Sequence, residues 1–80
     1  MNESVLREIA RLRARSKNVR FEELQRVWKR AGGEVRAPRR GSHHKFIFGR
    51  SRVIVPYHRG HVDASYVLEV LDNLEEHLRE

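Results

Sequence analysis

The chain has 80 residues, of which 39% are hydrophobic and 35% are charged, and its formal net charge at pH 7 is +6. A chain of this length forms one domain with a small core, so we interpret residues 1–80 as a single domain. It contains no cysteine, which excludes disulfide frameworks and thiolate metal sites. No apolar run approaches the ~20 residues of a membrane span, and no basic N-terminal region precedes an apolar run. We therefore expect a cytoplasmic protein that does not act at a membrane.

Apolar residues that recur every three or four positions predict three helices. The first is expected from Asn2 to Arg15, and the second from about Phe21 to Ala31, where Gly32-Gly33 stops it. Asp63 is expected to cap the third helix. The predicted apolar stripes are Val5, Ile9 and Leu12; Phe21, Leu24, Val27, Trp28 and Ala31; and Val67, Val70, Leu71, Leu74 and Leu78.

Three short strands are predicted between the second and third helices. They are expected at Val35–Arg39, His43–Phe48 and Arg52–Pro56, with a hairpin turn at Gly49-Arg50-Ser51. The order is then α-α-β-β-β-α. This order favours an α+β fold in which a three-stranded antiparallel sheet carries the helices on one face.

The side chains of a strand alternate between the two faces of its sheet. In the strand expected at His43–Phe48, one set of alternate residues is mostly aromatic and should face the helices: His44, Phe46 and Phe48. The other set should lie on the open face of the sheet: His43, Lys45 and Ile47.

Positive charge is concentrated in the middle of the chain. From Arg36 to His61 there are seven Lys or Arg residues and no Asp or Glu, and four of the five histidines also lie there. From Val62 to Glu80, in contrast, six acidic residues accompany one arginine. We therefore expect the central block to bind phosphate groups and the last helix to face away from that surface.

With these elements in place, the chain resembles the HicA family, the toxin half of a prokaryotic toxin–antitoxin pair. The resemblance rests on the opening Phe21–Leu24 of the second helix, its Gly32-Gly33 stop, and the element Gly41-Ser42-His43-His44. An aromatic residue at Phe46, the strand Val53–Pro56 and a closing helix complete it.

The resemblance covers about residues 19–78. We therefore divide the chain into an N-terminal helical extension, residues 1–17, and a HicA-like core, residues 19–80. The resemblance implies a fold like the double-stranded-RNA-binding domain, endoribonuclease activity on mRNA, and inhibition by an acidic HicB-like antitoxin. It also implies one essential histidine, which corresponds to His43.

The chemistry of RNA cleavage suits such a residue. The 2′-hydroxyl of RNA can attack the adjacent phosphate once a base removes its proton, and an acid must protonate the leaving 5′-oxygen. Neutral imidazole suits the first role and imidazolium the second, so we interpret His43 as the catalytic base or acid. Because the central block lacks carboxylates, we expect neither a metal nor another cofactor.

Several residues near His43 are candidates for binding the RNA substrate: Ser42, Lys45, Arg39, Arg40 and Arg52. Lys45 should share the face of His43 and stabilise charge on the scissile phosphate, although a solvated strand lysine is an equally simple interpretation. Ser42 either binds phosphate or caps the turn before its strand.

Two other functions fit the same residues. One is a non-catalytic RNA-binding module, although such a module should carry lysines at the start of the last helix, where this chain has Asp63. The other is a basic protein-interaction domain that binds only an acidic partner. Self-association, for which the N-terminal helix is one candidate surface, is a further alternative that the sequence leaves open.

Overall fold

The computed structural model describes residues 3–57 and 60–79, so His58 and Arg59 of the central cationic block lie outside the described residues. The first half contains α1 (Glu3–Ala14), a short 3-10 turn η1 (Ser16–Asn18) and α2 (Phe21–Arg30). The second half contains β1 (Glu34–Arg36), β2 (His43–Phe48), β3 (Ser51–Pro56) and α3 (Ala64–Leu78). This confirms the predicted α+β class and the order α-α-β-β-β-α.

The three strands form one antiparallel sheet, as predicted, and their order in it is β1-β2-β3. The bounds of β2 agree with the prediction, and β3 begins at Ser51, one residue before the predicted Arg52. Strand β1 begins at Glu34 and ends at Arg36, so the predicted Val35–Arg39 strand is wrong at both ends. Pro38 has no N–H to donate to a neighbouring strand, which explains the early end. Gly49, at φ +60°, begins the tight turn that pairs Phe48 with Ser51.

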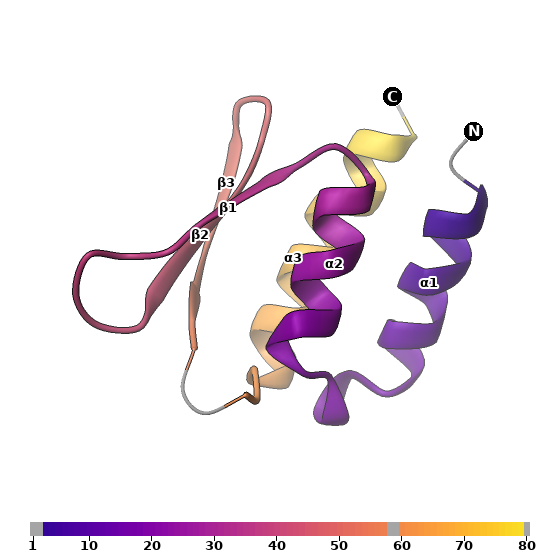
Figure 1. Ribbon diagram of the computed structural model, residues 1–80. Helices are drawn as coiled ribbons and strands as arrows, with labels where there is room; N and C mark the ends of the chain where they lie inside the picture. The colour runs from indigo at the N-terminus through magenta and orange to yellow at the C-terminus, as the bar shows by residue number, and fades with distance from the viewer. Residues whose placement is uncertain (1–2, 58–59, 80) are drawn as a thin grey trace.

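The helices lie on one side of the sheet, but in two layers (Figure 1). Helices α2 and α3 pack directly on the sheet, whereas α1 packs on α2 and α3 from behind. The prediction that the helices share one face of the sheet is therefore correct for α2 and α3, and α1 adds a third layer.

The core is continuous through these layers. Val5, Ile9 and Leu12 of α1 are buried in the same cluster as Trp28 of α2 and Phe46 of β2. Helix α1 is thus part of the common core, and its apolar stripe is covered by the neighbouring helices.

Trp28 connects α2 to the sheet. Its ring is fully buried, and its indole N–H is 3.1 Å from the carbonyl oxygens of both Glu34 in β1 and Ile47 in β2. One donor is thus shared between two strands. Gly33 makes this possible, because a Cβ added there would lie 2.3 Å from Trp28 Nε1 and 2.5 Å from its Cδ1.

We predict that Gly33→Ala destabilises the fold by about 2–3 kcal/mol, because the new methyl group must displace the indole ring from both carbonyls. The measurement is urea unfolding followed by circular dichroism. Gly41→Ala is the control: its φ of +81° disfavours alanine, but no atom lies within 4 Å of the added Cβ, so it should cost only about 1 kcal/mol. Equal destabilisation by the two variants would contradict the role assigned to Gly33.

Arg13 joins α1 to α3. Its Nη2 lies 2.7 Å from Asp72 Oδ1 and 2.6 Å from Glu75 Oε1. Hydrogen bonds from Arg79 and then from Arg13 lower the pKa of Glu75 below its ordinary value of 4.5. A carboxylate with a lowered pKa stabilises the folded state above its ordinary pKa, and this stabilisation is lost as the pH falls through the folded value.

We therefore predict that Arg13→Gln lowers the free energy of unfolding by about 1 kcal/mol at pH 7, which is roughly 4–8 °C in Tm. The stabilisation that Glu75 gives is lost as the pH falls through its lowered pKa, so the difference in Tm between the two proteins should shrink as the pH is lowered from 7. Thermal melts over a series of decreasing pH values test this, with Arg7→Gln on the exposed side of α1 as the control. A Tm difference that stays the same throughout the series would show that Arg13 acts through packing alone.

Candidate nucleic-acid interface

The inward set of β2 side chains fixes the orientation of this strand. Phe46 is fully buried, and the half-buried His44 packs edge-on against Phe21 at 4.8 Å and Tyr57 at 5.4 Å between ring centroids. His44 Nδ1 lies 3.0 Å from the carbonyl oxygen of Ser42. A carbonyl only accepts, so Nδ1 carries the hydrogen. The predicted inward, structural position of His44 is confirmed.

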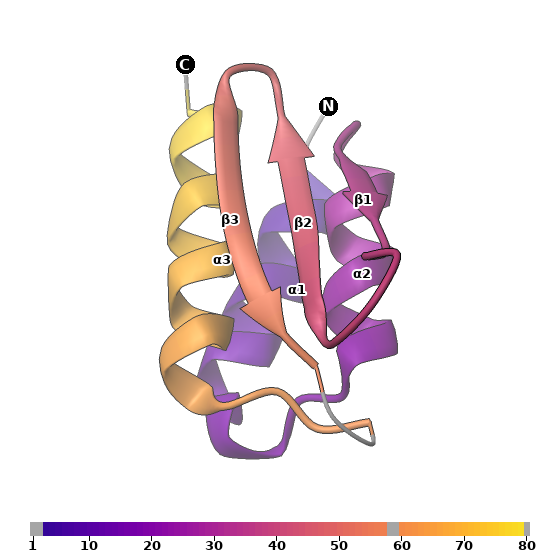
Figure 2. The same cartoon turned by 90° about the vertical axis from the view of Figure 1, so that its left-hand side faces the viewer.

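Because His44 and Phe46 point inward, the neighbouring His43 and Lys45 point outward, as predicted. Both are exposed. Figure 2 looks onto this side of the sheet, where the strands lie in front of all three helices. His43 is the first residue of β2 and is paired with Pro56 of β3.

The strand pairing defines the rest of this surface, which we call the open face: Glu34, Arg36, His43, Lys45, Ile47, Arg52 and Ile54. Lys45 lies between Arg36 of β1 and Ile54 of β3. Ile47 lies between Glu34 and Arg52 in the next row towards the hairpin. The open face therefore brings together His43, Lys45 and Arg52, three of the six predicted site residues.

The other predicted site residues lie beside the open face. Arg39 and Arg40 are exposed in the loop between β1 and β2, so Arg39 is outside the strand in which it was expected. Ser42 precedes β2, and its carbonyl accepts the Tyr57 N–H at 2.9 Å as well as the His44 contact. The backbone of Ser42 thus extends the β2–β3 pairing by one step, and phosphate binding by its side chain stays a prediction.

Glu34 is an acidic residue on the open face that the sequence analysis missed. Its Oε2 lies 2.6 Å from Arg36 Nε, so it neutralises one of the cations there. The signal was present in the sequence: had the first strand been extended by one residue from Val35, alternation would have put Glu34 on the face of Arg36.

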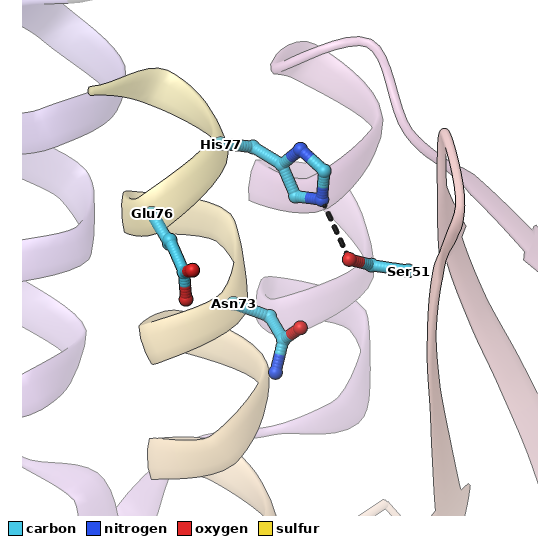
Figure 3. Close-up of a pocket in the computed structure, with 4 residues that line it drawn as sticks. All are labelled: Ser51, Asn73, Glu76 and His77. Atoms are coloured by element: carbon cyan, nitrogen blue, oxygen red, sulfur yellow. Dashed lines mark hydrogen bonds between the residues drawn. The ribbon is translucent and has the colours of Figure 1, made fainter. Parts of the chain in front are cut away.

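A second missed site lies at the other end of β2. His77 of α3 stacks on Phe48 with ring centroids 4.6 Å apart, and its Nε2 lies 2.8 Å from Ser51 Oγ. Ser51 and His77 line a small pocket together with Asn73 and Glu76 (Figure 3). Phe48 and Ser51 are paired with each other and share the helix-covered side of the sheet with Phe46, opposite the open face. The pocket is therefore separate from the open face, and its stacked histidine holds α3 against the hairpin.

The acidic side chains are mostly elsewhere in the fold. Glu69, Asp72 and Glu76 are exposed on α3, on the opposite side of the sheet from the open face. Among residues 3–57 and 60–79, no three His, Asp or Glu side chains gather in a way that would hold a metal ion. No helix in this part of the chain is long and apolar enough to cross a membrane.

Comparison with protein-family models, with curated proteins and with solved structures gives no significant match. The function is therefore inferred from the arrangement of the side chains and from the resemblance described above.

We predict that Glu34→Gln strengthens polyanion binding, because it frees Arg36 and raises the net charge of the open face by one. The measurement is the salt concentration at which the protein elutes from a heparin column, which should rise. Glu22→Gln is the matched control: it makes the same change in total charge at an exposed position of α2, away from the sheet. An equal rise for both variants would mean that the polyanion responds to net charge and not to the open face.

Proposed function

We propose that this chain is a metal-independent endoribonuclease of the HicA type, the toxin of a type II toxin–antitoxin pair, and that it cleaves mRNA with His43. The observation that carries the proposal is the exposed imidazole of His43, two residues from Lys45 on a sheet face that is not covered by any helix of the described residues. Of the described histidines, His44 and His77 are held by inward side-chain contacts. His61 is exposed but lies outside the sheet, where its backbone forms an isolated bridge with Arg20.

In the proposed reaction, the 2′-oxygen of a ribose attacks the adjacent phosphorus and the bond from phosphorus to the 5′-oxygen breaks. His43 either takes the proton from the 2′-hydroxyl or gives one to the leaving 5′-oxygen, and water exchanges the other proton. The products are a 2′,3′-cyclic phosphate and a free 5′-hydroxyl. No external nucleophile or cofactor is required.

The nearby cations have the complementary role. Lys45 lies two residues from His43 on the same face, a separation of about 6.6 Å along the strand. It would stabilise the negative charge that develops on the phosphate oxygens. Arg52 of β3, with Arg39, Arg40 and Ser42 in the loop before β2, would bind neighbouring phosphates.

The start of α3 favours this enzyme over a reader of duplex RNA. A double-stranded-RNA-binding module with this order of elements would need cations there. Here Asp63 caps the helix and places a carboxylate there, and hydrogen bonds from the Ser65 hydroxyl and then the Ser65 N–H lower the pKa of that group below its ordinary value. Under this proposal, residues 19–80 adopt the general layout of a double-stranded-RNA-binding domain without its mode of RNA binding.

The proposal also defines the partner and the compartment. An enzyme that cleaves mRNA acts in the cytoplasm, and its antitoxin would be an acidic HicB-like protein that covers the open face and His43. Positive charge from Lys45 and Arg52 would attract both the substrate and the inhibitor, so the two should compete.

We predict that purified protein cleaves single-stranded RNA in EDTA and that His43→Ala lowers the cleavage rate at least about 100-fold, the range typical for loss of a general acid or base. The measurement is a gel assay with end-labelled RNA. His61→Ala, which removes another exposed imidazole, is the control and should keep most of the activity.

Other results would overturn the proposal. Equal cleavage by the wild-type chain and a folded His43→Ala variant would mean that another residue or a contaminant cuts the RNA. If neither protein cuts but both bind RNA in a salt-dependent way, the chain is a binding module.

A further inference from the structure

We infer that the open face binds RNA as a single strand, with a nucleobase packed on Ile47 and Ile54 and the flanking phosphates on Lys45 and Arg52. This inference rests on the proposed function. It adds an apolar contact that positions the base beside the reacting phosphate, a contact that the proposed reaction itself does not require.

Ile54 is the first observation. It is a large apolar side chain that is 39% exposed, and Leu68 on α3 is the other such side chain among the described residues, at 37%. Ile54 lies directly opposite Lys45 on β2. A strand residue surrounded by cations and water would ordinarily be polar, because the solvated face of a half-covered sheet favours polar side chains. The apolar contact surface of Ile54 is therefore available for a ligand.

The second observation is the alternation of apolar and cationic side chains. Across β2 and β3, Lys45 is paired with Ile54, and Ile47 is paired with Arg52. Paired side chains lie about 5 Å apart and diagonal neighbours about 7–8 Å apart. The four residues thus form a two-by-two array in which the isoleucines occupy one diagonal and the cations occupy the other.

A single strand of RNA presents the complementary pattern. Each nucleotide offers an anionic phosphate and, next to it, the flat apolar face of a base that is free to leave its stack. In a duplex the base faces are stacked on one another and only phosphates and groove edges are accessible, so isoleucines on this surface would have no partner. The array therefore favours a single strand.

The acidic residue on the open face restricts the path of that strand. Glu34 lies beside Ile47 on the β1 side and neutralises Arg36. A phosphate is therefore disfavoured over β1 and favoured between β2 and β3, over Lys45 and Arg52. A base packed on Ile54 would then be within about one nucleotide of the phosphate next to His43.

The test is a binding experiment in the His43→Ala background, where RNA cleavage is expected to be too slow to disturb the measurement. The probes are a fluorescein-labelled 12-nucleotide single-stranded RNA and the 12-base-pair duplex of the same sequence, measured by fluorescence anisotropy. Ile54→Ala should raise the Kd for the single strand about five- to tenfold, because part of an apolar contact is lost. The slope of log Kd against log salt should stay unchanged, because no charge is removed.

Leu68→Ala is the matched control, since it removes a similarly exposed aliphatic side chain from α3, outside the open face. It should leave the Kd unchanged. Ile54→Thr keeps the β-branched shape that strands favour, so it separates the loss of the apolar contact from any effect on folding. It should weaken single-strand binding as Ile54→Ala does.

Three results would overturn the inference, and they are distinguishable. If the His43→Ala chain binds neither RNA and the wild-type chain cuts none, the proposed function itself fails. If single-stranded RNA binds but Ile54→Ala and Leu68→Ala have equal Kd values, the proposed function stands and the base contact is wrong. If Ile54→Ala weakens single strand and duplex equally, Ile54 supports the shape of the sheet and does not contact a base.

Discussion

The candidate site depends on a single shared hydrogen-bond donor, the indole N–H of Trp28. Its two acceptors, the carbonyls of Glu34 and Ile47, belong to neighbouring strands. The helix therefore determines where β1 lies along β2, and this register sets Arg36 beside Lys45 and Glu34 beside Ile47. The close approach of Gly33 to the indole ring is the condition for this arrangement. A substitution at Gly33 would therefore disturb the open face through the indole ring and the two strand carbonyls that it contacts.

The outward position of His43 has a similar indirect cause. The backbone of β2 is oriented by its inward residues, and the first of these is the half-buried His44 instead of an apolar side chain. Edge contacts with Phe21 and Tyr57 and the hydrogen bond to the Ser42 carbonyl satisfy that imidazole. Two adjacent histidines thus have opposite roles: one is held by the core, and the other is exposed because its neighbour is held. An aliphatic residue at position 44 would keep the alternation but lose the link to Ser42.

The parts of the fold that the sequence predicted correctly are those governed by local patterns. The bounds of β2 follow from alternation between a glycine-containing turn on each side. The start of α2 and the Asp63 cap of α3 follow from local patterns in the same way, although α2 ends at Arg30, one residue before the predicted Ala31. The ends of β1 were wrong because its three residues are too few for alternation to be read, and Pro38 was treated as the end of the strand and not as a residue outside it. The layer of α1 was not predictable in this way, because an apolar stripe shows which face is buried but not which element covers it.

The same distinction holds for the site. His43, Lys45 and Arg52 were predictable, since each depends on alternation within its own strand. Glu34 was missed because the first strand was expected to begin one residue later, at Val35. The contacts of His77 were missed because they join segments distant in the chain. Ile54 shares the alternation of Arg52, but its position opposite Lys45 depends on the pairing between strands. A block free of carboxylates along the sequence is not a surface free of carboxylates, and Glu34 enters the open face through its pairing with Ile47.

The net charge of +6 also overstates the positive charge that is available to bind a phosphate ligand. Arg11, Arg13, Arg15, Arg36 and Arg79 each lie within reach of a carboxylate in the described part of the chain. The pairs made by Arg13 join α1 to α3 and neutralise part of the negative charge of α3. The pair between Arg36 and Glu34 neutralises positive charge on the open face. On the open face, Lys45 and Arg52 form no such pair with the described residues. Because Lys45 and Arg52 are few, attraction between these cations and phosphates alone would leave a ligand free to slide along the sheet. Apolar contacts such as those offered by Ile47 and Ile54 are then what would hold one nucleotide in register with His43.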